Sequence, residues 1–100
     1  METSSPVVQY RRRGASGTLS LGGIVDIFEA QSVHAAALAA WKDAKASSLK
    51  IDLSQLEQVD IAILQILENL RHCLDRDQRP FQIIAAPSIT QFAKPFGLTL

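Results

Sequence analysis

The sequence predicts an α/β fold, a mixed β-sheet of about four to five strands with about three helices. Strand-like segments alternate with helical segments after the first third of the chain, which favours parallel strands joined by right-handed crossovers. Two strand-like segments near the N-terminus are separated only by turn residues, which adds an antiparallel hairpin. One hundred residues suit one domain, so we expect 1–100 to form it, with residues 1–6 flexible.

The hairpin is predicted from the first 25 residues. Residues 7–10 include two β-branched residues and one aromatic residue, and residues 14–17 are turn formers. Residues 18–21 alternate polar and apolar side chains, as a half-buried strand does. Gly22 and Gly23 then predict a bend or a bulge.

The first helix is predicted over residues 27–46, which are rich in alanine. Asp26 precedes it and Glu29 follows three residues later, an acidic variant of the capping box. Trp41 has two interpretations, a core residue that covers the sheet or an exposed partner anchor. One face carries apolar residues at spacings of three and four: Ala30, Val33, Ala37, Leu38, Trp41 and Ala44.

A strand and the second helix follow. Leu49, Ile51 and Leu53 alternate with polar residues, so a strand should end near Ser54, before a tight loop over residues 55–59. The helix is predicted from about 61 to 74. Its wide apolar stripe comprises Ile63, Leu64, Ile66, Leu67, Leu70, Cys73 and Leu74.

The last quarter of the chain predicts three short elements. Residues 81–86 read as a buried strand, which Pro87 ends. Ser88 can cap a third helix that runs to about Lys94. Residues 98–100 are expected to add a short edge strand.

Composition limits the partners. The formal net charge is zero, and Arg11–Arg13 are the only basic run, so we expect no nucleic-acid partner. The longest apolar run, residues 35–41, is too short to span a bilayer, so we expect no direct membrane insertion. The one cysteine, Cys73, is expected to be a buried, inert thiol in a cytoplasmic protein.

Enzyme motifs are scarce in this chain. It has neither a phosphate-binding glycine loop nor a dinucleotide-binding turn. His34 and His72 lie on separate predicted helices without metal-ligand spacing, and Cys73 points about 100° away from His72. We therefore expect a protein that is not an enzyme and that holds no metal and no cofactor.

Asp60 is the polar residue that stands out, because it directly precedes the long apolar helix. Its carboxylate can cap that helix by accepting backbone N–H bonds. A role in recognition is compatible with capping, since binding sites of α/β sheets gather at the carboxyl ends of the strands.

Four segments, in this order, resemble the STAS domain family of the bacterial anti-anti-sigma factors. Residues 18–26 resemble its entry into the first helix, and residues 51–54 (Ile-Asp-Leu-Ser) resemble its Val-Asp-Leu-Ser strand. Residues 59–67 are similar to its Ile-Asp-Ser-Ser-Gly-Leu-x-x-Leu segment. Residues 88–98 are similar to its closing helix, which ends in Gly-Leu.

The resemblance implies a STAS-like sheet that docks to a protein partner: an anti-sigma factor with kinase activity, a signalling complex or a transporter subunit. It also implies that phosphorylation at the start of the second helix controls docking. The family's phosphorylated serine falls on Ala62, a degenerate phosphosite, which leaves Ser54 as an alternative. The expected partner-binding residues are Asp60, Ile61, Ala62 and Leu64, together with the adjoining first helix. Helical geometry separates Ile61 and Ile63 by about 200°, so we expect Ile61 to be the more exposed of the two.

Two functions follow from this resemblance. The first is a non-enzymatic interaction module in bacterial signalling that lacks the phosphoserine switch. The alternative is a cytoplasmic accessory STAS subunit of a transporter, such as a lipid ABC transport complex. A homodimer is a further expectation, because a chain without net charge has little charge repulsion against self-association.

Overall fold

A computed structural model describes residues 6–97 of the chain. The strands are β1 (Val7–Arg13), β2 (Ser16–Val25), β3 (Ser48–Val59) and β4 (Phe81–Ala85). The helices are α1 (Ala30–Lys42), α2 (Ile61–Arg76) and α3 (Pro87–Ala93), with two 3₁₀ turns, η1 (Ile27–Glu29) and η2 (Lys94–Phe96).

The sheet is mixed, as the sequence predicts, and its strand order is β1-β2-β3-β4. β1 pairs with β2 antiparallel, while β2, β3 and β4 run parallel. The hairpin turn is tighter than expected, because Arg13 already pairs with Ser16. The expected edge strand over 98–100 lies outside the described residues, and so do residues 1–5 of the segment expected to be flexible.

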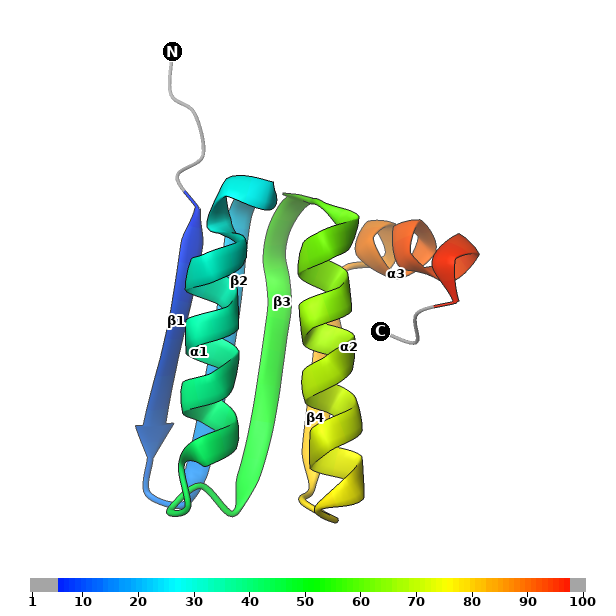
Figure 1. Cartoon of the computed structure of the whole chain (residues 1–100). Coiled ribbons are helices and arrows are strands. Elements are labelled where there is room, and N and C mark those ends of the chain that lie inside the picture. Colours follow the sequence, from blue (N-terminus) through cyan, green and yellow to red (C-terminus); the bar gives the residue numbers. More distant parts are fainter. Residues whose placement is uncertain (1–5, 98–100) are drawn as a thin grey trace.

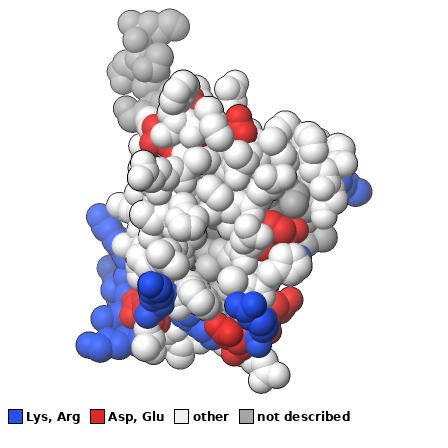
Figure 2. All heavy atoms as spheres, in the orientation of Figure 1, with Lys and Arg blue, Asp and Glu red and all other residues white. Residues whose placement is uncertain are grey.

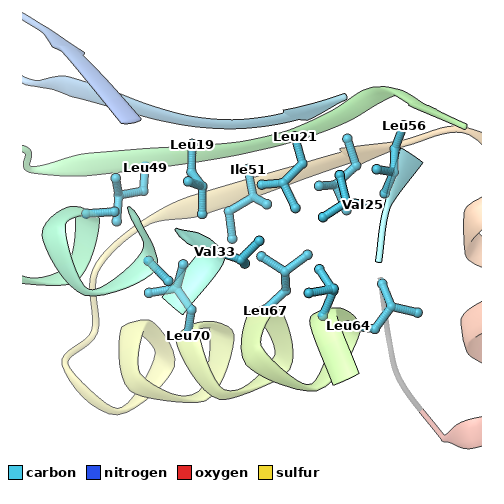
Figure 3. Packing of buried hydrophobic residues seen from close by; sticks show 14 of the residues in the cluster. Leu19, Leu21, Val25, Val33, Leu49, Ile51, Leu56, Leu64, Leu67 and Leu70 are labelled. Carbon is cyan, nitrogen blue, oxygen red and sulfur yellow. The ribbon is translucent and has the colours of Figure 1, made fainter. Parts of the chain in front are cut away.

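Helices α1 and α2 cover one face of the sheet, and α3 lies beyond the end of β4 (Figure 1). The core fills the space between this helical layer and the sheet. Leu19, Leu21 and Ile51 point from the strands toward Leu64 and Leu67 of α2 (Figure 3). Each fully buried leucine of this kind stabilises the fold by roughly 1.5–3 kcal/mol. The opposite face of the sheet carries none of the described helices.

The loop expected after Ser54 is wrong, because β3 continues to Val59. The pairing between β2 and β3 shifts twice, between Ser20 and Gly22 and between Gly23 and Ile24. At each shift β3 has one residue more than β2, which is the geometry of a β-bulge. The bulges change which side chains face the helices, so the sequence alternation breaks although the strand does not.

Helix α1 ends at Lys42, four residues before the predicted end. Asp43 has extended backbone angles, and its carboxylate accepts hydrogen bonds from the Tyr10 hydroxyl (2.7 Å) and from Arg12 Nε (3.0 Å). The bond from Tyr10 is the main cause that lowers the pKa of Asp43. Contacts with β1 therefore stop a helix that its alanine-rich sequence would continue, and Ala44, predicted on its apolar face, lies exposed in the turn that follows.

Arg79 holds the same end of α1 from the loop before β4. Its guanidinium donates to the carbonyl oxygens of Trp41 (2.7 Å) and Ala46 (2.7 Å), and at longer range to those of Ala40 and Asp43. The last carbonyls of a helix lack partners within the helix. Arg79 donates the missing hydrogen bonds to these carbonyl oxygens, and thereby connects α1 to the end of α2.

Helix α2 begins as predicted and ends two residues late. Asp60 has extended backbone angles, and its Oδ1 accepts a hydrogen bond from the Ala62 N–H at 2.9 Å, so it is the N-cap. After Arg76 the chain turns through Gln78, whose φ of 58° is left-handed. The expectation of a buried Cys73 is wrong, since its side chain is partly exposed.

Helix α3 begins two residues earlier than predicted, and its N-cap is Ala86 in place of Ser88. Pro87 occupies the first helical position, where its fixed φ suits a helix and its missing N–H costs nothing. Gly97, with a φ of 76°, ends the following turn η2.

Candidate functional site

The carboxyl ends of β2 and β3 meet at one end of the sheet, where η1 and α2 begin (Figure 1). The two strand ends are joined directly, because the Asp60 N–H donates to the Val25 carbonyl oxygen at 3.1 Å. In open α/β sheets this end of the parallel strands is where ligands and partners bind. The candidate site is therefore the surface formed by η1 and the first turn of α2.

An aspartate caps each of the two helical segments at this end. Asp26 Oδ1 accepts from the Phe28 N–H at 3.0 Å, and Asp60 Oδ1 accepts from the Ala62 N–H. A carboxylate at this position satisfies a free backbone donor and interacts favourably with the positive end of the helix. The sequence predicts both aspartates at helix starts, and the structure confirms both.

Three exposed apolar side chains lie beside these caps. Phe28 is 87% exposed, Ile27 is 51% exposed and Ile24 is 38% exposed. Sequence patterns place Ile27 and Phe28 inside a regular helix, and for this reason they do not predict these residues by name as site residues. The signal in the sequence is that Phe28 does not belong to the apolar face of the predicted helix. We call Ile24, Ile27 and Phe28 the apolar patch.

The four predicted partner-binding residues differ in accessibility. Asp60, Ile61 and Ala62 are half-buried and reach the surface next to η1. Leu64 is 0% exposed and belongs to the core, so the expectation that it contacts a partner is wrong in this structure. It follows Asp60 by one helical turn and points under the helix, toward the sheet. Ile63 is fully buried while Ile61 is not, as predicted.

The charge around this surface is acidic. In Figure 2 the upper end of the molecule shows red side chains and no blue ones. Asp26, Glu29 and Asp60 are the acidic residues of the helix starts. The apolar patch is thus bordered by carboxylates and by backbone N–H groups that are already capped.

Ser54, the alternative phosphosite, lies on the open face of the sheet and is exposed. Its hydroxyl donates to Asp52 Oδ1 at 2.6 Å, and its backbone N–H donates to the same oxygen at 3.0 Å. These two bonds, the hydroxyl bond first, lower the pKa of Asp52. A phosphate on Ser54 would therefore meet an ionised carboxylate at hydrogen-bond distance.

A shallow hollow of about 200 Å³ lies between α1 and α2. Trp41 packs against the core at its border and donates from Nε1 to Asp77 Oδ2 at 2.8 Å, which favours the core interpretation of this tryptophan. His34 and Cys73 also line the hollow, one from each helix.

Other kinds of site are absent from the described part of the chain. Among residues 6–97, no group of three or more His, Cys, Asp or Glu side chains is placed to hold a metal ion. None of the helices described there is long and apolar enough to cross a membrane.

Solved structures of similar fold cover nearly the whole chain. The phosphorylated Bacillus cell fate determinant SpoIIAA matches 92% of this chain and 85% of its own, with a TM-score of 0.71 and 14% identity. An anti-sigma factor antagonist from Mycobacterium paratuberculosis matches 95% and 86%, with a TM-score of 0.73 and 24% identity. Unphosphorylated SpoIIAA matches 93% and 86%, at 0.70 and 13%. At these identities the likeness is one of fold.

The sequence itself gives the family. No curated protein matches the chain significantly. The family model described as "Mlab, STAS domain" matches residues 8–99. Since that match spans nearly all of the sequence, and the observed sheet and helices agree with it, the chain belongs to the STAS domain family.

Proposed function

We propose that this STAS domain is a non-enzymatic protein-interaction module of bacterial signalling that acts in the cytoplasm. It docks through the apolar patch together with the exposed parts of Asp60, Ile61 and Ala62. The observation that carries the proposal is Phe28, an aromatic side chain left 87% exposed at the end of the sheet where partners bind. Exposed aromatic residues that become buried in a complex contribute much of its binding energy.

The partner proposed for this surface is an anti-sigma factor or another protein of a signalling complex. The support comes from fold, since anti-sigma factor antagonists are among the structures that the chain resembles. The acidic border of the patch favours a partner with basic residues around an apolar pocket. Phe28 and Ile27 would fill that pocket.

Docking is proposed to be constitutive. Ala62 stands where the family resemblance expects a phosphorylated serine, and its methyl group cannot accept a phosphate. One of the solved relatives is a phosphorylated SpoIIAA, so the switch belongs to proteins of this fold. Ser54 is a poor substitute, because Asp52 would repel the added charge.

A second candidate is an accessory STAS subunit of a transporter, such as a lipid ABC transport complex. The description of the matching family model, which names Mlab, supports this candidate. The solved structures of similar fold include an anti-sigma factor antagonist, which supports the first candidate. The docking surface would be the same, and only the partner would differ.

The test is a pull-down from native cells with the wild type and with Phe28→Ser. We expect the substitution to reduce the amount of partner captured, because loss of a central aromatic side chain costs about 2 kcal/mol or more of binding free energy. Phe96→Ser is the matched control, because it removes a half-exposed phenylalanine from η2, away from the patch. Equal capture by wild type and Phe28→Ser would contradict the proposed surface.

Mass spectrometry of the captured partner separates the two candidates. An anti-sigma factor or kinase supports signalling, and a membrane ATPase supports transport. Light scattering of the purified wild type tests a third arrangement, in which the apolar patch joins two copies of this chain in a homodimer.

A further inference from the structure

Basic side chains gather at the end of the molecule opposite the apolar patch. β1, α1 and α2 end there (Figure 1), and Figure 2 shows blue side chains along the lower left edge and the bottom. Lys42 and Arg76 are in the last turns of their helices, where a cation stabilises the negative helix end. That structural role does not explain the arginines of β1.

The pleat of β1 divides its three arginines between the two faces of the sheet. Arg12 lies on the helical side, where it binds Asp43 and donates to the Gly14 carbonyl oxygen at 2.8 Å. Arg11 and Arg13 lie on the other side, and neither has an ion-pair partner among residues 6–97. The two free guanidinium groups therefore share the open face of the sheet.

A shallow hollow of about 500 Å³ lies on that face next to Arg11 and Arg13. Thr18 is paired with Arg11 across the strands, and Ser16 with Arg13, so a hydroxyl group stands beside each arginine. No acidic residue lines this hollow. The residues that line it are Gln9, Arg11, Arg12, Arg13, Ser16, Thr18 and Ser20.

β1 is also an edge strand. It pairs with β2 on one side, and no described residue forms a backbone hydrogen bond with its other side. Such an edge presents a row of free N–H and C=O groups that can pair with an extended segment of another chain. Charged residues on an edge discourage unwanted pairing, but they also select a strand of opposite charge.

We propose that the free edge of β1 binds an extended, acidic segment of a partner protein, which adds to the sheet as a fifth strand in the complex. Alternate side chains of a strand lie on the same face, roughly 7 Å apart. Carboxylates at every second residue of the segment would therefore match Arg11 and Arg13. Arg11 and Arg13 form a single row along the edge strand, and such a row fits an extended segment better than a flat anionic membrane.

This surface is separate from the one proposed for docking through Phe28. A result against one proposal therefore does not contradict the other. β1 carries its arginines at the end of the sheet opposite η1. Substitution of Phe28 should leave binding at β1 unchanged.

The test uses a short synthetic peptide of alternating glutamate and valine, with binding followed by the amide chemical shifts of the whole chain. We expect shifts concentrated in β1 and β2. Arg11→Glu combined with Arg13→Glu should weaken binding by about ten-fold or more, the effect of reversing two exposed charge pairs. Lys42→Glu combined with Lys45→Glu makes the same change of net charge at the same end of the molecule and should weaken it less than about two-fold.

Three outcomes would overturn the proposal. If both double variants lose the same affinity, the peptide binds by general charge attraction. If a peptide methylated at every second backbone nitrogen binds as well as the parent peptide, the edge of β1 does not pair with it. If vesicles containing phosphatidylserine bind while the peptide does not, the arginines serve a membrane surface instead.

Discussion

Aspartate recurs at four places where this chain changes its backbone conformation. Asp26, Asp43, Asp52 and Asp60 each accept a hydrogen bond from the backbone N–H two residues further on. A short carboxylate can form this bond because it reaches its own neighbouring backbone, which favours turns and helix starts over regular structure. The motif starts η1 and α2, ends α1, and accompanies the first bulge of β3.

Asp60→Ala tests the strongest of these bonds at the residue scale. Loss of the cap should lower the free energy of unfolding by about 0.5–2 kcal/mol. Denaturant titration measures this difference. Asp26→Ala is the matched control and should cost less, since η1 has three residues and α2 has sixteen. An unchanged stability together with lost partner binding would assign Asp60 to recognition alone.

Tyr10 provides a second test at the residue scale. Its burial, and then its hydrogen bond to Asp43, raise its pKa from 10.0 to about 12. The folded state thus holds the phenolic proton more tightly than the unfolded state, so this contribution to stability is complete below about pH 10 and disappears as the pH rises to about 12.

The measurement is direct because Tyr10 is the only tyrosine in the chain. Its tyrosinate absorbance should titrate near pH 12 in the folded protein and near pH 10 when unfolded. Tyr10→Phe should remove that part of the alkaline loss of stability which occurs between these two values. A folded-state titration near pH 10 would mean that the bond to Asp43 does not form.

At the scale of elements, neighbouring elements set where each one ends. Arg79 and Asp43 end α1, although its alanine-rich sequence favours a longer helix. β3 extends past its broken alternation because β2 pairs with it as far as Val59. Backbone partners supplied from a distance therefore outweigh local propensity at both places.

Arg79→Lys tests the contact between α1 and the end of α2. Lysine keeps the charge but lacks the planar fork that reaches several carbonyls, so the free energy of unfolding should fall by about 2 kcal/mol. Thermal unfolding followed by the fluorescence of Trp41, the single tryptophan, measures this loss. Arg76→Lys, at the exposed end of α2, should have little effect. Equal effects of the two substitutions would contradict the role of Arg79.

At the scale of the whole molecule, the topology separates two kinds of surface. The carboxyl ends of β2 and β3 carry the apolar patch with an acidic border, and the opposite end carries the arginines of β1. Two helices cover one face of the sheet, so the surfaces proposed for contact lie at its ends and on its open face. A molecule with no net charge thus presents surfaces of opposite character at its two ends.

A phosphorylation assay tests the proposal that docking is constitutive and is not controlled by a phosphoserine. Incubation with ATP, magnesium and an extract of the native cells should leave the intact mass of the wild type unchanged, because Ala62 has no hydroxyl. Ala62→Ser should gain one phosphate and lose affinity for the partner through the added charge. A phosphate on Ser54 of the wild type would show that the switch has moved and has not been lost.

Local patterns in the sequence determined much of the secondary structure and of the core of this protein. The order of strands and helices, the cap at Asp60 and the buried stripe of α2 follow from periodicity and capping, which depend on residues a few positions apart. The exposure of Ile61 relative to Ile63 follows from the same helical geometry.

The tertiary structure alone decided the end of α1, the bulges of β3 and the degree to which Phe28 is exposed. Leu64 and Phe28 are both large apolar residues near a helix start; the apolar stripe of α2 already includes Leu64, whereas the exposure of Phe28 depends on the turn η1. What differs is the neighbour: Leu64 faces the sheet, while η1 turns Phe28 away from it. Burial is a property of distant segments packed together, and short-range sequence patterns do not contain it.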